Sequence, residues 1–75
     1  MDYEFRRMLS NPEELERRKA YAKEESNIDL LLELNRFYRQ AGSNHPLTKT
    51  YKEEYDRRRN IYLQELVNKH EEKQR

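Results

Sequence analysis

The stretch "NIDLLLELNRFYRQAG", Asn27 to Gly42, decides the fold of this 75-residue chain. Its apolar side chains recur every three or four residues, which is the spacing of one helix face. Two overlapping series show this spacing: Leu31, Leu34, Tyr38 and Ala41, and Leu30, Leu34, Phe37 and Ala41. Ile28 and Leu32 fall to one side, so the helix is apolar around much of its circumference. One neighbouring helix covers only part of such a surface, which predicts a second contact with another copy or another protein.

The end of this helix is marked by Gly42, the only glycine of the chain. A glycine after an apolar run usually adopts the left-handed conformation that caps a helix C-terminus. His45 precedes Pro46 and is therefore biased away from helix. We expect a loop over 42–46 and a second helix over 47–72, which contains neither proline nor glycine.

A first long helix is predicted upstream, over residues 12–41. Asn11 is a favourable N-cap residue, and Pro12 suits the first helical position. Glu14 stands three residues after the cap, as in a capping box. The run 24–29 is rich in residues that favour caps over helix interiors. We expect it to form a polar turn within one continuous helix, and a hinge is the alternative.

The chain as a whole is predicted to be all-α. The expected architecture is one small domain over 1–75: an antiparallel two-helix hairpin with a short helical segment over 1–10. A loop of a few residues between two helices favours antiparallel packing. We also expect the hairpin to dimerise into a four-helix bundle, because a chain this short buries little surface by itself.

Composition narrows the class of protein. Charged residues make up 41% of the chain and hydrophobic residues 33%, with a net charge of +1. This mix is typical of a helical protein with many surface ion pairs. The absence of cysteine and of a long apolar run suggests a cytoplasmic protein without a membrane span.

The expected second helix carries one stripe of tyrosine, leucine and arginine. Its members are Leu47, Tyr51, Tyr55, Arg58, Tyr62 and Leu66. A tyrosine ring can be buried while its hydroxyl stays near water, so tyrosine suits the edge of a helix interface. We expect the tyrosines to pack on residues 30–38. In the alternative interpretation they are exposed and bind a partner.

The cluster Arg57 to Arg59 suggests nucleic-acid binding as a second alternative. This is not favoured, because Glu53, Glu54 and Asp56 stand beside the cluster and repel phosphate. Glu53 and Glu54 also precede Arg57 and Arg58 by four residues, which is the favourable order for helical ion pairs, whereas Arg59 has no such acid. The two histidines, His45 and His70, lack metal-ligand spacing and are expected as a solvated loop residue and a helix-end residue. We expect no catalytic residues, no metal and no cofactor.

A different alternative comes from the segment "EEYDRRRNIY", Glu53 to Tyr62. It resembles the second helix of the small helical-hairpin aspartyl-phosphate phosphatases of sporulation control. Glu54, Tyr55 and Asp56 align with their Glu-Leu-Asp, and Asn60 and Tyr62 with a later Asn and Tyr. The resemblance implies that Asp56 assists attack on the aspartyl phosphate of a response regulator.

The function we expect is that of a non-catalytic regulatory protein. It binds and modulates a larger protein, and it forms a homodimer. Tyrosine and arginine are enriched where binding energy concentrates. The partner-binding residues are expected among Leu31, Leu34, Phe37, Tyr38, Tyr55, Arg58, Arg59, Tyr62 and Leu66, some of which form the helix seam instead.

Overall fold

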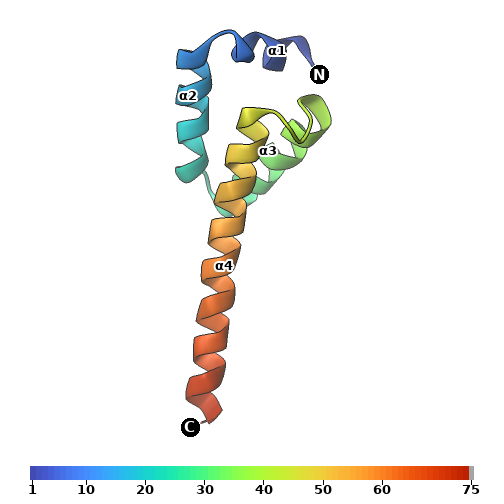
Figure 1. The fold of residues 1–75 in the computed structure, drawn as a ribbon. Helices are drawn as coiled ribbons and strands as arrows, with labels where there is room; N and C mark the ends of the chain where they lie inside the picture. The colour runs from blue at the N-terminus through green and yellow to red at the C-terminus, as the bar shows by residue number, and fades with distance from the viewer. Residues whose placement is uncertain (75) are drawn as a thin grey trace.

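The computed structural model describes residues 1–74, and side chains as far as Glu71. All secondary structure in this part of the chain is helical (Figure 1). The elements are α1 (Tyr3–Leu9), α2 (Pro12–Ala20), the 3-10 turn η1 (Tyr21–Lys23), α3 (Asn27–Gln40) and α4 (Pro46–Gln74). None of these helices has the length and apolar character needed to cross a membrane.

The expected continuous helix over 12–41 is wrong, because the chain breaks between α2 and α3. The Asn11 side chain does accept a hydrogen bond from the Glu14 N–H, as expected of an N-cap. The break follows Ala20, and Ser26 adopts an extended conformation whose Oγ accepts from the Asp29 N–H at 3.2 Å. Ser26 therefore starts a new helix, since its hydroxyl satisfies a free N–H of the first turn.

The turn between α3 and α4 follows the sequence prediction closely. Gly42 has a φ of +89°, the left-handed conformation expected after a helix C-terminus. Helix α4 begins at Pro46, one residue earlier than expected. The reason is His45, whose Nδ1 accepts a hydrogen bond from the Leu47 N–H at 3.1 Å. This side chain caps α4 in the way that serine or asparagine commonly does.

His45 is buried, so the expectation of a solvated loop histidine is wrong. Because Nδ1 accepts from Leu47, the ring proton belongs on Nε2, which donates to the Phe5 carbonyl oxygen at 2.9 Å. The imidazole thus ties α1 to the start of α4. Its ring also meets the Phe5 ring edge-on, with centroids 5.7 Å apart.

The hydrophobic core lies where α1, η1 and α3 meet the first half of α4. Three aromatic rings lie at its centre: Phe37 is 5.6 Å from Phe5 and 4.8 Å from Tyr51, both edge-on. The buried hydrophobic residues are Phe5, Met8, Ala22, Leu30, Leu34, Phe37, Ala41, Leu47 and Tyr51. We refer to this packed part of the molecule, residues 1–58, as the head.

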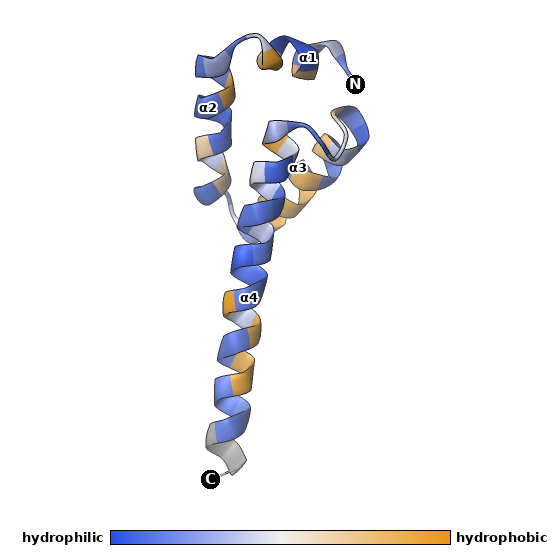
Figure 2. Cartoon of the chain, in the orientation of Figure 1, coloured by the Kyte–Doolittle hydropathy of each residue, from blue (hydrophilic) through white to orange (hydrophobic). Residues whose placement is uncertain are grey.

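Helix α4 extends far beyond the head (Figure 1). Its 29 residues span about 43 Å at 1.5 Å per residue, and the molecule measures 55 × 22 × 18 Å. Every described side chain from Arg59 to Glu71 is exposed. Figure 2 shows apolar residues along this part, which we call the projecting half of α4 (residues 59–74).

Candidate functional site

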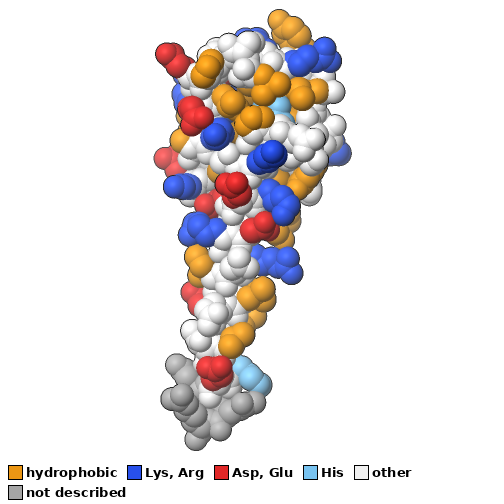
Figure 3. Space-filling model, viewed as in Figure 1, with side chains coloured by type: hydrophobic (Ala, Val, Ile, Leu, Met, Phe, Trp, Pro, Cys, Tyr) orange, Lys and Arg blue, Asp and Glu red, His pale blue; other side chains and the backbone are white. Residues whose placement is uncertain are grey.

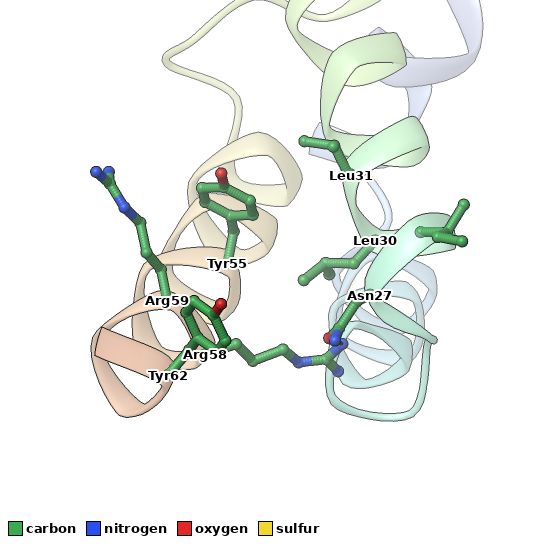
Figure 4. Close-up of a pocket in the computed structure, with 8 residues that line it drawn as sticks. Asn27, Leu30, Leu31, Tyr55, Arg58, Arg59 and Tyr62 are labelled. Atoms are coloured by element: carbon green, nitrogen blue, oxygen red, sulfur yellow. Dashed lines mark hydrogen bonds between the residues drawn. The ribbon is translucent and has the colours of Figure 1, made fainter. Parts of the chain in front are cut away.

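An apolar groove lies where the projecting half of α4 leaves the head. Its volume is about 360 Å³, and it runs between the start of α3 and the middle of α4 (Figure 4). The residues that line it are Asn27, Ile28, Leu30, Leu31, Tyr55, Arg58, Arg59 and Tyr62. We call this feature the α3–α4 groove.

The α3 wall of the groove consists of side chains that face away from the core. Leu30 and Leu34 point inward and are buried, whereas Ile28 is 72% exposed and Leu31 is 43% exposed. Leu32 continues this outer face and is also exposed. The helix is therefore apolar on two faces, as its sequence predicted, and the head covers only one of them.

The α4 wall carries two tyrosines and an arginine. Tyr55 is half-buried against the core, while Tyr62, two turns further along, is 60% exposed. Arg59 points out of the groove, away from the Arg58 guanidinium (Figure 4). It forms no ion pair or hydrogen bond with any described residue, so no described acidic side chain neutralises its charge.

Arg58, by contrast, holds the head together. Its guanidinium donates to Asn27 Oδ1 at 2.9 Å and to the carbonyl oxygens of Ala22 and Lys23, both at 3.2 Å. Its Nε also donates to Glu54 Oε2 at 2.7 Å. A single side chain thus joins α4 to the free carbonyls of η1 and to the start of α3, which fixes the base of the groove.

Glu54 is buried and takes part in two ion pairs. Arg57 donates to both of its carboxylate oxygens, at 3.0 and 2.6 Å, and Arg58 donates to one of them. The Arg57 hydrogen bonds and then those from Arg58 outweigh burial and lower the pKa of Glu54 to about 2. The carboxylate is charged at neutral pH and is fully satisfied, so its role is structural.

The apolar face of α4 continues past the groove along the projecting half. Tyr62, Leu63, Leu66 and Val67 are each 44% to 60% exposed. Figure 3 shows hydrophobic side chains along α4 below the head, most of them on the right-hand edge in this view. Together with the groove they form one extended apolar surface, which we call the binding face.

The structure places the expected partner-binding residues in different parts of the molecule. Leu31, Tyr55, Arg58, Arg59 and Tyr62 line the groove, and Leu66 lies further out on the projecting half. Leu34 and Phe37 are core residues, buried at 5% and 2% exposure, and cannot contact a partner. Tyr38 lies apart from the groove, beside Leu32 and Arg39 on the outer surface of α3.

The expected tyrosine packing holds for part of the stripe. Tyr51 is buried against Phe37, and Tyr55 packs on the core, as predicted. Tyr62 is exposed instead, because α3 starts near the level of Arg58 and, among the described residues, none buries the rest of α4.

The residues of the two alternative functions lie on α4. Within the arginine cluster, Arg57 and Arg58 are paired with Glu54, so Arg59 is the one without an acidic partner among the described residues. Asp56 accepts from Lys52 at 3.0 Å and is about half exposed. In the described part of the chain, no three His, Cys, Asp or Glu residues are close enough to hold a metal ion.

Sequence reasoning did not select Ile28, Leu63 and Val67 as binding residues. Ile28 was noted as lying beside the apolar face, and its 72% exposure makes it the most exposed hydrophobic residue of the groove. Leu63 and Val67 form a row next to the tyrosine stripe. The sequence feature that indicates them is the width of the apolar face of the second helix, which exceeds what one neighbouring helix covers.

Comparison with known proteins gives no relative. The chain matches no protein-family model, no curated protein and no solved structure.

Proposed function

We propose that this chain is a non-catalytic protein-interaction module that binds a helical segment of a larger protein along its binding face. The observation that carries the proposal is the exposure of Ile28, Leu31 and Tyr62 around one groove. Contiguous apolar patches of this kind on soluble proteins commonly mark interaction sites.

The shape of the groove favours a helix as the ligand. Two helices, α3 and α4, form its walls, and the projecting half of α4 extends the α4 wall. An amphipathic helix that lies in such a groove inserts apolar side chains at positions i, i+3, i+4 and i+7. The exposed face of α4 carries apolar residues at the same spacing, so ridges and grooves of the two helices can interlock.

The charge of Arg59 at the edge of the groove predicts the charge that the bound helix carries. Arg59 has no acidic partner among the described residues and stands beside Tyr62 on the groove wall. An Asp or Glu on the bound helix would pair with it, because an arginine fork matches a carboxylate. The proposed ligand is therefore an amphipathic helix with an acidic residue next to its apolar face.

Photo-cross-linking in the native cells tests the proposal. A photoreactive phenylalanine analogue replaces either Leu31 or Tyr62 on the binding face. In the control variants it replaces either Gln64 or Glu53, which lie on other faces of α4. We expect Leu31 and Tyr62 to give the same discrete adduct with a larger protein. Adducts of equal yield from all four positions, or none from Leu31 and Tyr62, would contradict the proposal.

A binding measurement with the cross-linked protein then tests the role of each wall. Leu31→Ala with Tyr62→Ala is expected to weaken binding at least tenfold, because both side chains lose apolar contact. Arg59→Ala is expected to weaken it less and to reduce its salt dependence. Arg17→Ala, on the exposed surface of α2, serves as the control and should leave binding unchanged.

A further inference from the structure

We infer that a second copy of this chain occupies the binding face when no other partner is bound, through antiparallel pairing of the two α4 helices. The inference rests on the proposed function in one respect, because it uses the same face. It adds the identity of a specific occupant, a relative orientation of the two helices, and competition between self-association and binding of the larger protein.

The projecting half of α4 requires a contact that the head does not give. Its described side chains are all exposed, and an isolated helix of about this length is only marginally stable in water. Within it, Gln64 Nε2 donates a hydrogen bond to Asn68 Oδ1 at 3.2 Å. Its helical structure would therefore gain most from burial of its apolar stripe against another helix.

The stripe has the width of a helix-pairing surface. At about 100° per residue, Tyr62, Leu63, Leu66 and Val67 fall within an arc of about 140°. Around the helix axis, Arg59 and His70 both lie at the centre of this arc. Along the axis, Arg59 precedes the four apolar residues and His70 follows them. The spacing of Arg59, Leu63, Leu66 and His70 is four, three, four, which is the spacing of a coiled-coil seam.

Charge distinguishes the two possible orientations. In a parallel pair each seam residue meets its own copy, so Arg59 would face Arg59 and two like charges would be buried together. In an antiparallel pair centred between Gln64 and Glu65, Leu63 of each copy meets Leu66 of the other. The two Arg59 side chains are then about 16 Å apart along the axis, which is more than a Debye length at physiological salt.

The antiparallel pair also fills the groove. The last turns of the second α4 come to lie beside Tyr55 and Arg59, in front of Ile28 and Leu31. Lys69 of each copy then lies within reach of the Tyr62 ring of the other, an arrangement that permits a cation–π contact. The groove of each copy is thereby completed by α4 of the other.

The area that becomes buried is sufficient for a dimer. The residues covered are Ile28, Leu31, Tyr62, Leu63, Leu66 and Val67, which are 43% to 72% exposed in the single chain. Their exposed surface amounts to roughly 600 Å² per copy, so two copies bury about 1,200 Å². This value is the lower end of the range for stable interfaces, which predicts a dimer that dissociates on dilution.

Sedimentation equilibrium from low-micromolar to millimolar concentration tests the pairing. The wild-type chain is expected to pass from monomer to dimer, and Leu66→Lys is expected to remain monomeric. Gln64→Lys adds the same charge on another face and should dimerise as the wild type does. Near-ultraviolet circular dichroism of the core aromatic residues checks that the head of each variant is folded. A wild-type chain that stays monomeric, or equal loss of the dimer in both variants, would overturn the inference.

Disulfide trapping tests the orientation, since the chain contains no cysteine of its own. Arg59→Cys and His70→Cys are made as separate variants with tags of different mass, mixed, and oxidised. The antiparallel pair predicts the mixed disulfide alone, because two copies of the Arg59→Cys variant would hold their thiols too far apart to bond. Disulfides within each variant, without the mixed species, would show a parallel pair and overturn the orientation.

The two proposals fail in different ways. If the chain is a monomer at all concentrations but Leu31 still cross-links to a larger protein, the dimer is wrong and the proposed function stands. If the dimer forms and the cross-linked adduct has twice the mass of the chain alone, the larger partner is wrong and the dimer stands. If both hold, the fraction of the chain found in the larger adduct at Leu31 should fall as the concentration of the chain rises into the range where it dimerises.

Discussion

The two halves of α4 both contain tyrosine and many charged residues, but their surroundings differ. The first half contains Tyr51 and Tyr55, which pack on the core, and the second contains Tyr62, which is exposed. Both halves are rich in charge and both carry an apolar stripe. The two halves differ in whether another segment of the chain packs against them. In the first half the tertiary structure stabilises the helix, whereas the described side chains of the second half are exposed, and we propose that a partner stabilises it.

The largest expected effect comes from the core that supports the first half. Phe37→Ala removes the ring that contacts both Phe5 and Tyr51. We expect a loss of about 3–5 kcal/mol, which is a large part of the stability of so small a protein. Thermal unfolding followed by circular dichroism measures it. Tyr62→Ala is the matched aromatic control, and an equal loss in that variant would show that the two halves do not differ.

Two adjacent arginines provide the sharpest test of the boundary between the halves. Arg58→Ala removes four hydrogen bonds and leaves Glu54 with Arg57 alone, so we expect a loss of about 2–3 kcal/mol. Arg59→Ala removes a solvated side chain and is expected to change stability by less than about 0.5 kcal/mol. Urea unfolding of both variants gives the comparison. Equal effects would place the boundary elsewhere.

The ion pairs of Glu54 predict the response of the head to acid. Its pKa of about 2 in the folded state lies below the ordinary value of 4.5. The stabilisation is therefore complete above about pH 4.5 and is lost as the pH falls towards 2. We expect this contribution to be roughly 2 kcal/mol. Stability of wild type and Glu54→Gln across this range tests it: the difference between them should shrink as the pH falls, and a constant difference would contradict the assignment.

His45→Asn separates the two roles of the histidine at the start of α4. Asparagine is a good N-cap and can accept from the Leu47 N–H, but it is too short to reach the Phe5 carbonyl. We expect a loss of about 1 kcal/mol, the contribution of one hydrogen bond between α1 and α4. His45→Ala removes the cap as well and should lose more. Equal losses in thermal unfolding would mean that the cap contributes nothing.

The smallest effect is expected when the projecting half is shortened. Removal of residues 63–75 deletes side chains that are exposed as far as they are described. At a concentration where both forms are monomeric, we expect the stability of the head to change by less than about 0.5 kcal/mol. Urea unfolding followed by near-ultraviolet circular dichroism measures it. A larger loss would show that the projecting half contacts the head.

Much of the fold could be predicted from local signals. The cap at Asn11, the left-handed Gly42 and the start of α4 near Pro46 are each decided by a few neighbouring residues. The break before Ser26 was visible as a cluster of cap-forming residues but was weighed as an exposed turn. Tertiary packing favours two separate helices, because the break brings α2 and η1 against α4 and allows Ala22 to be buried.

The candidate site could be predicted only in part. The sequence indicated a face of tyrosine, leucine and arginine, and five of the expected residues line the groove. It could not separate Leu34 and Phe37, which form the core, from Leu31, which faces out, because all three belong to one broad apolar pattern. It placed Arg58 in the apolar stripe, but it could not show that this side chain reaches the carbonyl oxygens of η1 and the start of α3.

By itself, the sequence determined that the chain is helical, that Asn11 and Gly42 mark the start and the end of a helix, and that its apolar surface exceeds what one helix neighbour can cover. These properties depend on residues within one or two turns of each other. The tertiary structure alone decided that α1 closes the core through Phe5 and His45, and that α4 extends beyond the helices that pack against it. Contacts between residues forty positions apart set these features, and no local pattern encodes them.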